Sequence, residues 1–509
     1  MTRRVTALVL ALLLALSLSG CWEAEEPEEE DFWNAPVQDE PAADEPLSTI
    51  SRFTLPYLSA QSFDPIVCID GVQQTIGALL YEPLFTLDEA FEPQGVLCSD
   101  CHCDEPSRVY TFTLRADVRF SDGSALSAQD VLATYRRAAE SARYGARFAA
   151  VEAMKAVDER TLTITLREAN ASFCALLDIP IVKAGTEGET APLGTGPYVF
   201  TPGAGGAALT VNSEWRGAQP PLARIELAAV KDNATAQSLF ASRSVHLLRL
   251  DPTGTDTRSF GGTAAMQNVP TAAMQFLGFN AQRGLTAVQS VRQAMSGVLD
   301  REGMVSSLLS GHGTAAQFPL SPESRRYPRA LSYHSSAQEY AAALADAGVG
   351  ANAPRTLTLL VSEENGFRLA LAESICAQLS TDVLTVELSA KPWEEYLAAL
   401  EAGRFDLYLG EVRLTADWDI GALIEPDGAL NYGGFVSEAL CAQFDAFLAD
   451  GSDNCFAGFA EEMPFAPLLF KSDAVLTPAG LIDGMTPTPS NPFAGLEDWT
   501  FHLIENAEN

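Results

Sequence analysis

The densest group of side chains that could do chemistry lies between residues 98 and 103. Cys98, Cys101, His102 and Cys103 supply thiols and an imidazole, which are the usual ligands of zinc. A structural zinc site usually draws on two separated ligand pairs, and the sequence offers no second pair with that spacing. A loop disulfide and free thiols are the alternatives, and the sequence leaves the pairing of the cysteines open. We therefore predict no bound metal and no cofactor.

Catalytic motifs are the next possibility. The sequence contains no nucleophile elbow, no phosphate-binding Walker loop, no zincin helix and no dinucleotide fingerprint. Its 5 histidines are dispersed along the chain, which weakens the case for a hydrolase or for a multi-histidine metal site. We predict a binding protein, and detectable turnover would restore the enzyme as an alternative.

Regular secondary structure must position any site in this chain. Apolar residues alternate at 110–114 and at 161–166, which predicts two half-buried strands. Between them, Ser127 and Asp130 form a capping box that opens a helix. The first part of the chain is therefore predicted to mix α and β elements.

The later part of the chain alternates strands and helices. Strands are predicted at 356–361, 383–388 and 405–409, each pair separated by a helical pattern. Such a βαβαβ unit forms a largely parallel sheet, and ligands bind beyond the carboxyl ends of its strands. The loop from Gly410 to Asp419 is therefore the predicted place for a site.

The N-terminal residues predict export. Arg3 and Arg4 precede an apolar run from Val5 to Leu18, which is the layout of a secretory signal and is too short to span a bilayer. The small residues that end at Cys21 resemble the bacterial lipobox. This resemblance implies that residues 1–20 are a signal peptide and that Cys21 carries a lipid anchor. An ordinary signal peptide with an incidental Cys21 is the alternative.

Composition sets further limits. Residues 21–47 are acidic and contain prolines, which predicts a flexible tether rather than a packed segment. The chain is 47% hydrophobic, and the roughly 460 residues beyond the tether can form two lobes with their own cores. The formal net charge of -35 excludes nucleic acid as a partner, because phosphates demand a basic surface.

Several motifs resemble the family 5 extracellular solute-binding proteins, the peptide and nickel binders of ABC importers. The most specific is Phe120-Ser121-Asp122-Gly123 followed by Ser127-Ala128-Gln129-Asp130-Val131, which matches the signature F-x-D-G-x-x-L-x-A-x-D-V. The likeness runs from about residue 50 to the C-terminus. Further matching segments follow in the expected order: Tyr81-Glu82-Pro83-Leu84-Phe85, Gly194-Thr195-Gly196-Pro197-Tyr198, Leu277-Gly278-Phe279-Asn280, Val291-Arg292-Gln293-Ala294 and Pro464-Phe465-Ala466-Pro467-Leu468.

This resemblance implies an α/β, two-lobed periplasmic-binding-protein fold of type II, cluster C, in which two strands cross a hinge beside an interlobe cleft. It implies lobe 1 at residues 48–270 plus 463–509 and lobe 2 at 271–462. A monomer on the outer face of the cell membrane or in the periplasm would capture oligopeptides or a similar small solute and deliver them to an ABC permease with a separate ATPase. Relatives also bind nickel complexes, opines, glycans or haem, and a sensor without transport is a further alternative.

The resemblance also implies which residues bind the ligand. In peptide-binding relatives an aspartate in an A-D-Y or G-D-N step takes the α-ammonium of the peptide, and Ala416-Asp417-Trp418 falls on that step. A buried carboxylate needs a cationic partner, which an ammonium group supplies. Relatives continue with D-P and an apolar pair, whereas Asp419-Ile420 follows here, so the match is partial.

Aromatic residues are predicted to form the apolar walls of the site. Trp418, Trp393 and Tyr81 are the candidates, because large rings cover the side chains or backbone of an extended ligand. Trp393 shares a helical stripe with other apolar residues, so a place in the core is its alternative. Asn431 and Tyr432 fall where relatives have an asparagine-containing strand near the ligand, although a plain turn explains the glycines beside them equally well.

Overall fold

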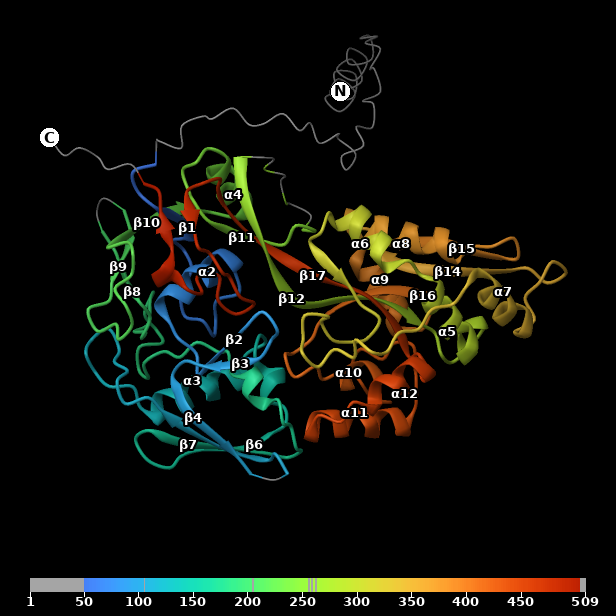
Figure 1. Ribbon diagram of the computed structural model, residues 1–509, viewed down its shortest axis with the longest axis horizontal. Helices are drawn as coiled ribbons and strands as arrows, with labels where there is room; N and C mark the ends of the chain where they lie inside the picture. The colour runs from blue at the N-terminus through green and yellow to red at the C-terminus, as the bar shows by residue number, and fades with distance from the viewer. Residues whose placement is uncertain are drawn as a thin grey trace, which may run out of the picture. The chain divides into compact units, whose positions relative to one another are not determined.

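Mixed sheets and helices form the folded part of the chain, and Figure 1 shows their arrangement. The structure is a computed structural model, and it describes residues 50–104, 106–203, 206–254, 257, 260 and 263–503. The predicted signal peptide, Cys21 and the predicted tether therefore lie outside the described residues. Among the residues that are described, no helix is both long and apolar enough to cross a bilayer.

The first part of the chain, up to Leu250, forms two four-stranded sheets, a small hairpin and three α-helices among the residues described there. Its strands are β1 (Thr54–Leu58), β2 (Phe85–Leu87), β3 (Pro93–Gly95), β4 (Cys98–Cys103), β5 (Val109–Leu114), β6 (Val151–Ala156), β7 (Thr161–Leu166), β8 (Tyr198–Thr201), β9 (Ala208–Val211), β10 (Arg224–Val230) and β11 (Leu248–Leu250). Its helices are α2 (Gly71–Leu80), α3 (Ala128–Glu140) and α4 (Asn233–Ala241), and the 3-10 turns are η1 (Gly145–Phe148) and η2 (Phe173–Leu176).

The predicted strands and capping box of this part are confirmed. Strands β5 and β7 coincide with the alternating segments, and they pair antiparallel with Tyr110 opposite Ile164 in the sheet β4-β5-β7-β6. Helix α3 begins after Ser127, whose backbone and hydroxyl both donate to the Asp130 carboxylate. The inward residues of β5 and β7 are buried because each strand presents its apolar face to this helix-covered core.

The second part of the chain contains the larger sheet. The strands of this second part are β12 (Ala264–Phe279), β13 (Gly313–Ala315), β14 (Arg355–Ser362), β15 (Leu384–Lys391), β16 (Leu407–Arg413), β17 (Phe465–Pro478), β18 (Ile482–Asp483) and β19 (Thr500–Phe501), and the last two form a separate two-stranded sheet. Its helices are α5 (Gln289–Val298), α6 (Arg301–Leu309), α7 (Ala337–Asp346), α8 (Gly366–Leu379), α9 (Trp393–Glu401), α10 (Gly421–Ile424), α11 (Glu438–Asp450) and α12 (Asn454–Glu462), with 3-10 turns η4 (Leu285–Ala287) and η5 (Leu496–Asp498).

The predicted βαβαβ unit is confirmed, with one correction at its end. Strand β14 pairs in parallel with β15 on one side and with β16 on the other, and α8 and α9 connect them. The prediction that the loop starts at Gly410 was wrong, because β16 continues to Arg413. The cause is tertiary, since β12 supplies partners that the local pattern could not reveal, with Gly410 opposite Phe276 and Arg413 opposite Ala273.

Two long strands connect the two parts of the fold. Strands β12 and β17 pair antiparallel over most of their length, and their register shifts between Pro270 and Met274. At one end β17 also pairs with β11 of the first part, and at the other end β12 pairs with β16 of the second part. Figure 1 shows this pair running between the two halves. The pair has the topology of a hinge, whereas the exact lobe limits stay predictions.

Separate apolar cores occupy the two parts. The cluster around Phe112 and Tyr135 belongs to the first part, and the cluster around Leu359 and Ile375 belongs to the second. A further cluster crosses between the parts, because Phe91 from the first part is buried together with residues such as Trp418 from the second. The predicted site loop therefore leads directly into packing between the lobes.

Candidate functional site

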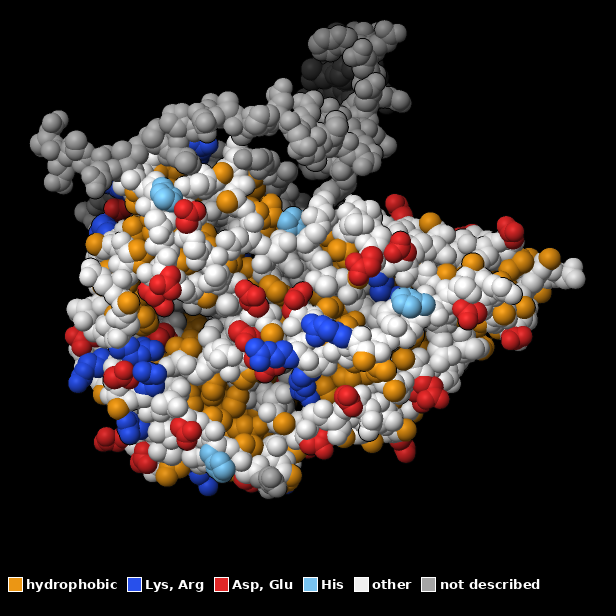
Figure 2. Space-filling model, in the orientation of Figure 1, with side chains coloured by type: hydrophobic (Ala, Val, Ile, Leu, Met, Phe, Trp, Pro, Cys, Tyr) orange, Lys and Arg blue, Asp and Glu red, His pale blue; other side chains and the backbone are white. Residues whose placement is uncertain are grey.

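A large cavity lies where the two lobes meet. It has a volume of about 1080 Å³, and residues from both lobes line it. Tyr81 and Asp178 come from lobe 1, and the segment from Arg413 to Ala416 comes from lobe 2. This volume lies slightly above the usual range for small-ligand sites. Figure 2 shows one face of the molecule, on which hydrophobic side chains are exposed near the middle and acidic and basic side chains lie around them.

Asp417 lies directly behind this wall and is 3% exposed. Asn170 of lobe 1 donates from Nδ2 to its Oδ2 at 2.8 Å. The Oδ1 atom receives a much weaker contact from the backbone nitrogen of Asp419, at 3.5 Å. Across the part of the chain that the structure describes, no lysine, arginine or histidine forms an ion pair with Asp417. This buried carboxylate therefore has a neutral amide as its main hydrogen-bond partner, while Arg147 and Arg326 act on it electrostatically from beyond ion-pair distance.

Trp418 is part of the packing beside that carboxylate. Its side chain is 2% exposed, and its backbone has a φ of 64°, a conformation that side-chain-bearing residues rarely adopt. The indole packs edge-on against Phe91 at 5.1 Å and against Phe470 at 6.1 Å, measured between ring centroids. Phe91 itself lines the cavity. Trp418 thus supports the cavity wall through Phe91, and its predicted contact with a ligand stays a prediction.

Tyr81 reaches the cavity from the end of α2. It is 2% exposed, and its hydroxyl is buried without a hydrogen-bond partner among the described residues. Desolvation is the main reason why the pKa of Tyr81 lies well above its usual value. The predicted glycine turn explains this close packing, since a Cβ on Gly194 would meet the Leu80 carbonyl oxygen at 2.1 Å and the Tyr81 ring at 2.5 Å.

The other predicted binding residues lie away from the cavity lining. The Asn431 amide donates to the Glu425 and Phe435 carbonyl oxygens at 2.8 Å each, so it closes its own loop. Tyr432 packs edge-on against Tyr408 at 6.2 Å. Trp393 is 42% exposed and stacks on Tyr396, which contradicts the core alternative for this residue. Of the six predicted residues, Tyr81 lines the cavity, Asp417 and Trp418 follow the lining residue Ala416 in sequence without lining the cavity themselves, and Asn431, Tyr432 and Trp393 lie elsewhere.

Sequence reasoning missed several residues of this region. Asn170 lies in a loop after β7 and contacts Asp417 across 247 positions of sequence, so no local signal could find it. The Arg147–Asp178 ion pair lines the cavity, and Arg249 pairs with Asp473 there at 2.9 Å. Arg413 was within the predicted site loop but was not singled out. It lines the cavity and has no carboxylate within ion-pair distance among the described residues.

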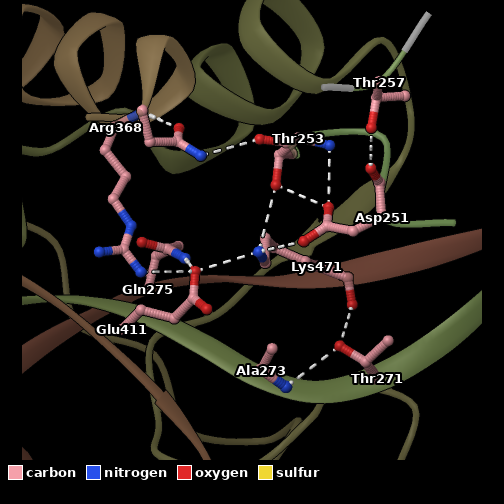
Figure 3. Close-up of polar contacts among 10 residues, drawn as sticks. Asp251, Thr253, Thr257, Thr271, Ala273, Gln275, Arg368, Glu411 and Lys471 are labelled. Atoms are coloured by element: carbon pink, nitrogen blue, oxygen red, sulfur yellow. Dashed lines mark hydrogen bonds and ion pairs between the residues drawn. The ribbon is translucent and has the colours of Figure 1, made fainter. Parts of the chain in front are cut away.

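A network of charged side chains lies at the hinge (Figure 3). Lys471 on β17 is 7% exposed, and its Nζ contacts Asp251 of lobe 1 at 2.7 Å and Glu411 of lobe 2 at 3.0 Å. Arg368 on α8 pairs with Glu411 at 3.1 Å, and Gln275 on β12 donates to the same carboxylate. The network therefore joins both lobes to a crossing strand.

The charges of this network are balanced. Desolvation acts to raise the pKa of Glu411, but Lys471 and Arg368 outweigh it and hold that pKa below its usual value. The pKa of Asp251 is lowered in the same way, since Lys471 and the hydrogen bonds of Thr253 overcome desolvation. Both carboxylates thus remain ionised beside resident cations. This network is suited to holding the hinge rather than to receiving a ligand.

The cysteine group that opened the sequence analysis lies on strand β4, outside the cavity lining. Within the described residues, no group of three or more His, Cys, Asp or Glu side chains is arranged to hold a metal ion. The Cys98 thiol contacts the Asp100 carbonyl oxygen at 3.1 Å, and the Cys101 and Cys174 sulfurs lie 3.4 Å apart. The geometry therefore favours thiol or disulfide chemistry over zinc.

The fold and the cavity define the class of this protein. Two lobes joined by crossing strands around an interlobe cleft make a periplasmic-binding-protein fold of type II, cluster C. Residues 92–424 match the bacterial extracellular solute-binding proteins, family 5 Middle. This chain belongs to that family, which consists of extracytoplasmic solute-binding proteins rather than enzymes.

Individual relatives agree with this assignment. The oligopeptide-binding protein AppA of Bacillus subtilis is 22% identical over 98% of this chain and 99% of its own length. The glutathione-binding protein GsiB of Pectobacterium atrosepticum is 26% identical, over 54% of this chain and 56% of its own length. The structure of NikZ from Campylobacter jejuni in complex with Ni(L-His) is similar in fold, with a TM-score of 0.64 at 18% identity over 89% of this chain and 100% of that one.

Proposed function

We propose that this chain is the substrate-binding lipoprotein of an ABC importer, which captures oligopeptides in the interlobe cleft and delivers them to a membrane permease. The observation that carries the ligand class is Asp417. It is 3% exposed, and its main partner is the neutral amide of Asn170 at 2.8 Å. A buried carboxylate is stabilised best by a cation that also donates hydrogen bonds, and an α-ammonium group does both.

A charge in the cavity lining, close in sequence to Asp417, supports a ligand with two charged ends. Arg413 lies four positions before Asp417 and lines the cavity, and it forms no ion pair with the residues that the structure describes. Its guanidinium suits the carboxylate of a peptide. Two acids of the lining, Asp178 and Asp473, already have arginine partners. A zwitterionic peptide therefore satisfies this site better than a neutral glycan.

The test measures unfolding temperature with pooled short peptides whose N-termini are free or acetylated. A ligand that binds only the native protein stabilises it, by about 2.7 kcal/mol at one hundred times its dissociation constant. We expect a shift with the free peptides and a much smaller one with the acetylated peptides. Nickel-histidine complexes form a third arm, because NikZ was solved with such a ligand.

Asp417→Asn keeps the shape of the side chain and the acceptor for Asn170 but removes the charge. We expect at least about a tenfold loss of affinity for free peptides, since a hydrogen bond to a charged group contributes about 1.5–3 kcal/mol. Asp427→Asn, an exposed acid of the same lobe, is the matched control and should bind as wild type does. Equal binding of free and acetylated peptides by wild type would refute the role of Asp417.

We also propose that Cys21 carries a lipid anchor and that the protein releases its ligand without chemical change. Cys21 follows a secretory signal, so Cys21→Ser should move the protein from the membrane fraction to the soluble fraction. Peptides recovered from the purified protein should be intact, because a binding protein releases its ligand unchanged. Peptide cleavage that follows the protein through purification would contradict this part.

A further inference from the structure

Two cysteines from separate segments meet in lobe 1. Cys101 lies on strand β4 and Cys174 lies in the 3-10 turn η2, and their sulfurs are 3.4 Å apart across 73 positions of sequence. Both side chains are partly buried against the same apolar cluster, which includes Tyr110 and Phe173. Thiols held this close need little rearrangement to form a covalent bond.

Nearby and distant cysteines have other contacts. Cys98 contacts the carbonyl oxygen of Asp100 at 3.1 Å, and Cys103 contacts that of Asp104 at 3.4 Å. In the part of the chain that the structure describes, the remaining cysteines are Cys68, Cys376, Cys441 and Cys455, and they lie in other segments. The geometry therefore selects one partner for Cys174 from the three cysteines of strand β4.

The segment that carries Cys174 also makes the contacts between the lobes. Asn170 donates to Asp417, and the Ala171 backbone nitrogen donates to the Leu448 carbonyl oxygen at 2.8 Å. Arg326 of lobe 2 donates to the hydroxyl of Ser172 at 2.6 Å. Residues 170–172 thus present three consecutive polar groups to lobe 2, and η2 follows at once. A crosslink at Cys174 would fix these groups on the sheet of lobe 1.

We propose that Cys101 and Cys174 form a disulfide in the exported protein, and that this bond braces the segment that holds Asn170 against Asp417. Each thiol loses its proton, and the two sulfurs together give up two electrons as the S–S bond forms. A disulfide of an extracytoplasmic thiol-disulfide oxidoreductase accepts these electrons and becomes a dithiol. The bond depends on the extracytoplasmic location of the family and not on the identity of the ligand.

The thiols are also unequal in acidity, which supports the same pairing. The hydrogen bond from Cys174 is the main reason why the pKa of Cys101 lies below its usual value. The same contact raises the pKa of Cys174. Both pKa shifts follow from the 3.4 Å contact between the two sulfurs, which is the observation that selects this pair.

Peptide mapping of the full-length protein tests this proposal directly. The protein is isolated from cells without reductant, its free thiols are blocked with N-ethylmaleimide, and its peptides are analysed before and after reduction. We expect a linked pair of peptides joined through Cys101 and Cys174, with Cys98 and Cys103 alkylated before reduction. Complete alkylation of Cys101 and Cys174 without reductant, or a link from Cys174 to another cysteine, would overturn the proposal.

Thermal unfolding with and without dithiothreitol provides a second measurement. We expect reduction to lower the Tm of wild type by at least about 5 °C, because the bond closes a long loop. Cys101→Ser and Cys174→Ser should lose this sensitivity to reductant, whereas Cys376→Ser, on α8 of lobe 2, should keep it. An equal response of all three variants would count against the bond. The mapping decides the question even if a variant fails to fold.

Discussion

Carboxylates in two regions of this protein interact with different kinds of partner. At the hinge, Glu411 has Lys471 at 3.0 Å and Arg368 at 3.1 Å (Figure 3). Beside the cavity, Asp417 has the amide of Asn170 at 2.8 Å and no ion pair among the described residues. The first region is electrically complete without a ligand. The second has a buried carboxylate with no described cation in direct contact, on which Arg147 and Arg326 act only from a greater distance, and we propose that a cationic ligand binds there.

The two regions also differ in what holds them together. The hinge network depends on ion pairs that join strands β16 and β17, helix α8 and the loop at Asp251. The Asp417 region depends on aromatic packing, because Trp418 lies between Phe91 of lobe 1 and Phe470 on β17. Removing charge should therefore affect stability most at the hinge, and removing a ring should affect it most beside the cavity.

The largest expected effect comes from Trp418→Ala. Its indole is 2% exposed, and removing a buried ring of this size usually costs about 3–5 kcal/mol of unfolding free energy. Trp393→Ala is the matched control, because that ring is 42% exposed and should change stability by about 0.5 kcal/mol or less. Denaturant unfolding measures both. Similar losses of unfolding free energy in the two variants would show that Trp418 contributes no more to stability than the exposed Trp393.

Lys471→Met should have the next largest effect. It leaves Asp251 without its cation and Glu411 with Arg368 alone. Because these carboxylate side chains are 39% and 25% exposed, we expect a loss of about 2–3 kcal/mol, below the usual cost of breaking a fully buried pair. Lys231→Met, whose side chain is 81% exposed, should stay within about 0.5 kcal/mol of wild type. A loss as small as the control's would remove the distinction between hinge and surface charges.

Asn170→Asp tests the claim that Asp417 has a neutral partner. The new carboxylate would face Asp417 across the 2.8 Å contact, and two such groups cannot both ionise at low cost. We expect a loss of about 1–2 kcal/mol at neutral pH that is largely recovered near pH 4, where the pair shares a proton. Unfolding curves at both pH values measure this. A loss that is independent of pH would mean that the substitution acts through loop geometry instead.

The smallest expected effect is a change in how stability depends on pH when Asp419 is replaced. Desolvation, together with Asp417, Glu425 and Asp445, raises its pKa to about 6. An acid whose pKa is higher in the folded state than in the unfolded state binds more protons when folded, so it lowers stability as the pH rises from about 4 to 6. Asp419→Asn should remove this loss and gain less than about 1 kcal/mol above pH 6, because part of the side chain is exposed and solvent screens it from the neighbouring acids. A constant difference between variant and wild type from pH 4 to 7 would contradict it.

Much of the fold could be predicted from the sequence, because local patterns encode it. The capping box at Ser127 and Asp130 and the βαβαβ unit from β14 to β16 are confirmed. The end of β16 was not predictable, since its last residues are held by β12, a strand more than one hundred positions earlier. The family was recognisable because its signature is a contiguous set of turn and helix-cap residues.

The site was predicted only in part. The sequence singled out Asp417 and Trp418 as candidates. Their partners come from distant segments, because Asn170 contacts Asp417 and Phe91 packs against Trp418. The contact between Lys471 and Glu411 at the hinge also spans a long stretch of chain. The sequence by itself determined the family, the strands β5 and β7, the capped helix α3 and the order of the βαβαβ unit, because each depends on neighbouring residues. Only the tertiary structure decided which buried carboxylate lacks a direct ion pair among the described residues and which cysteines meet, because burial and pairing depend on segments that folding brings together from distant positions.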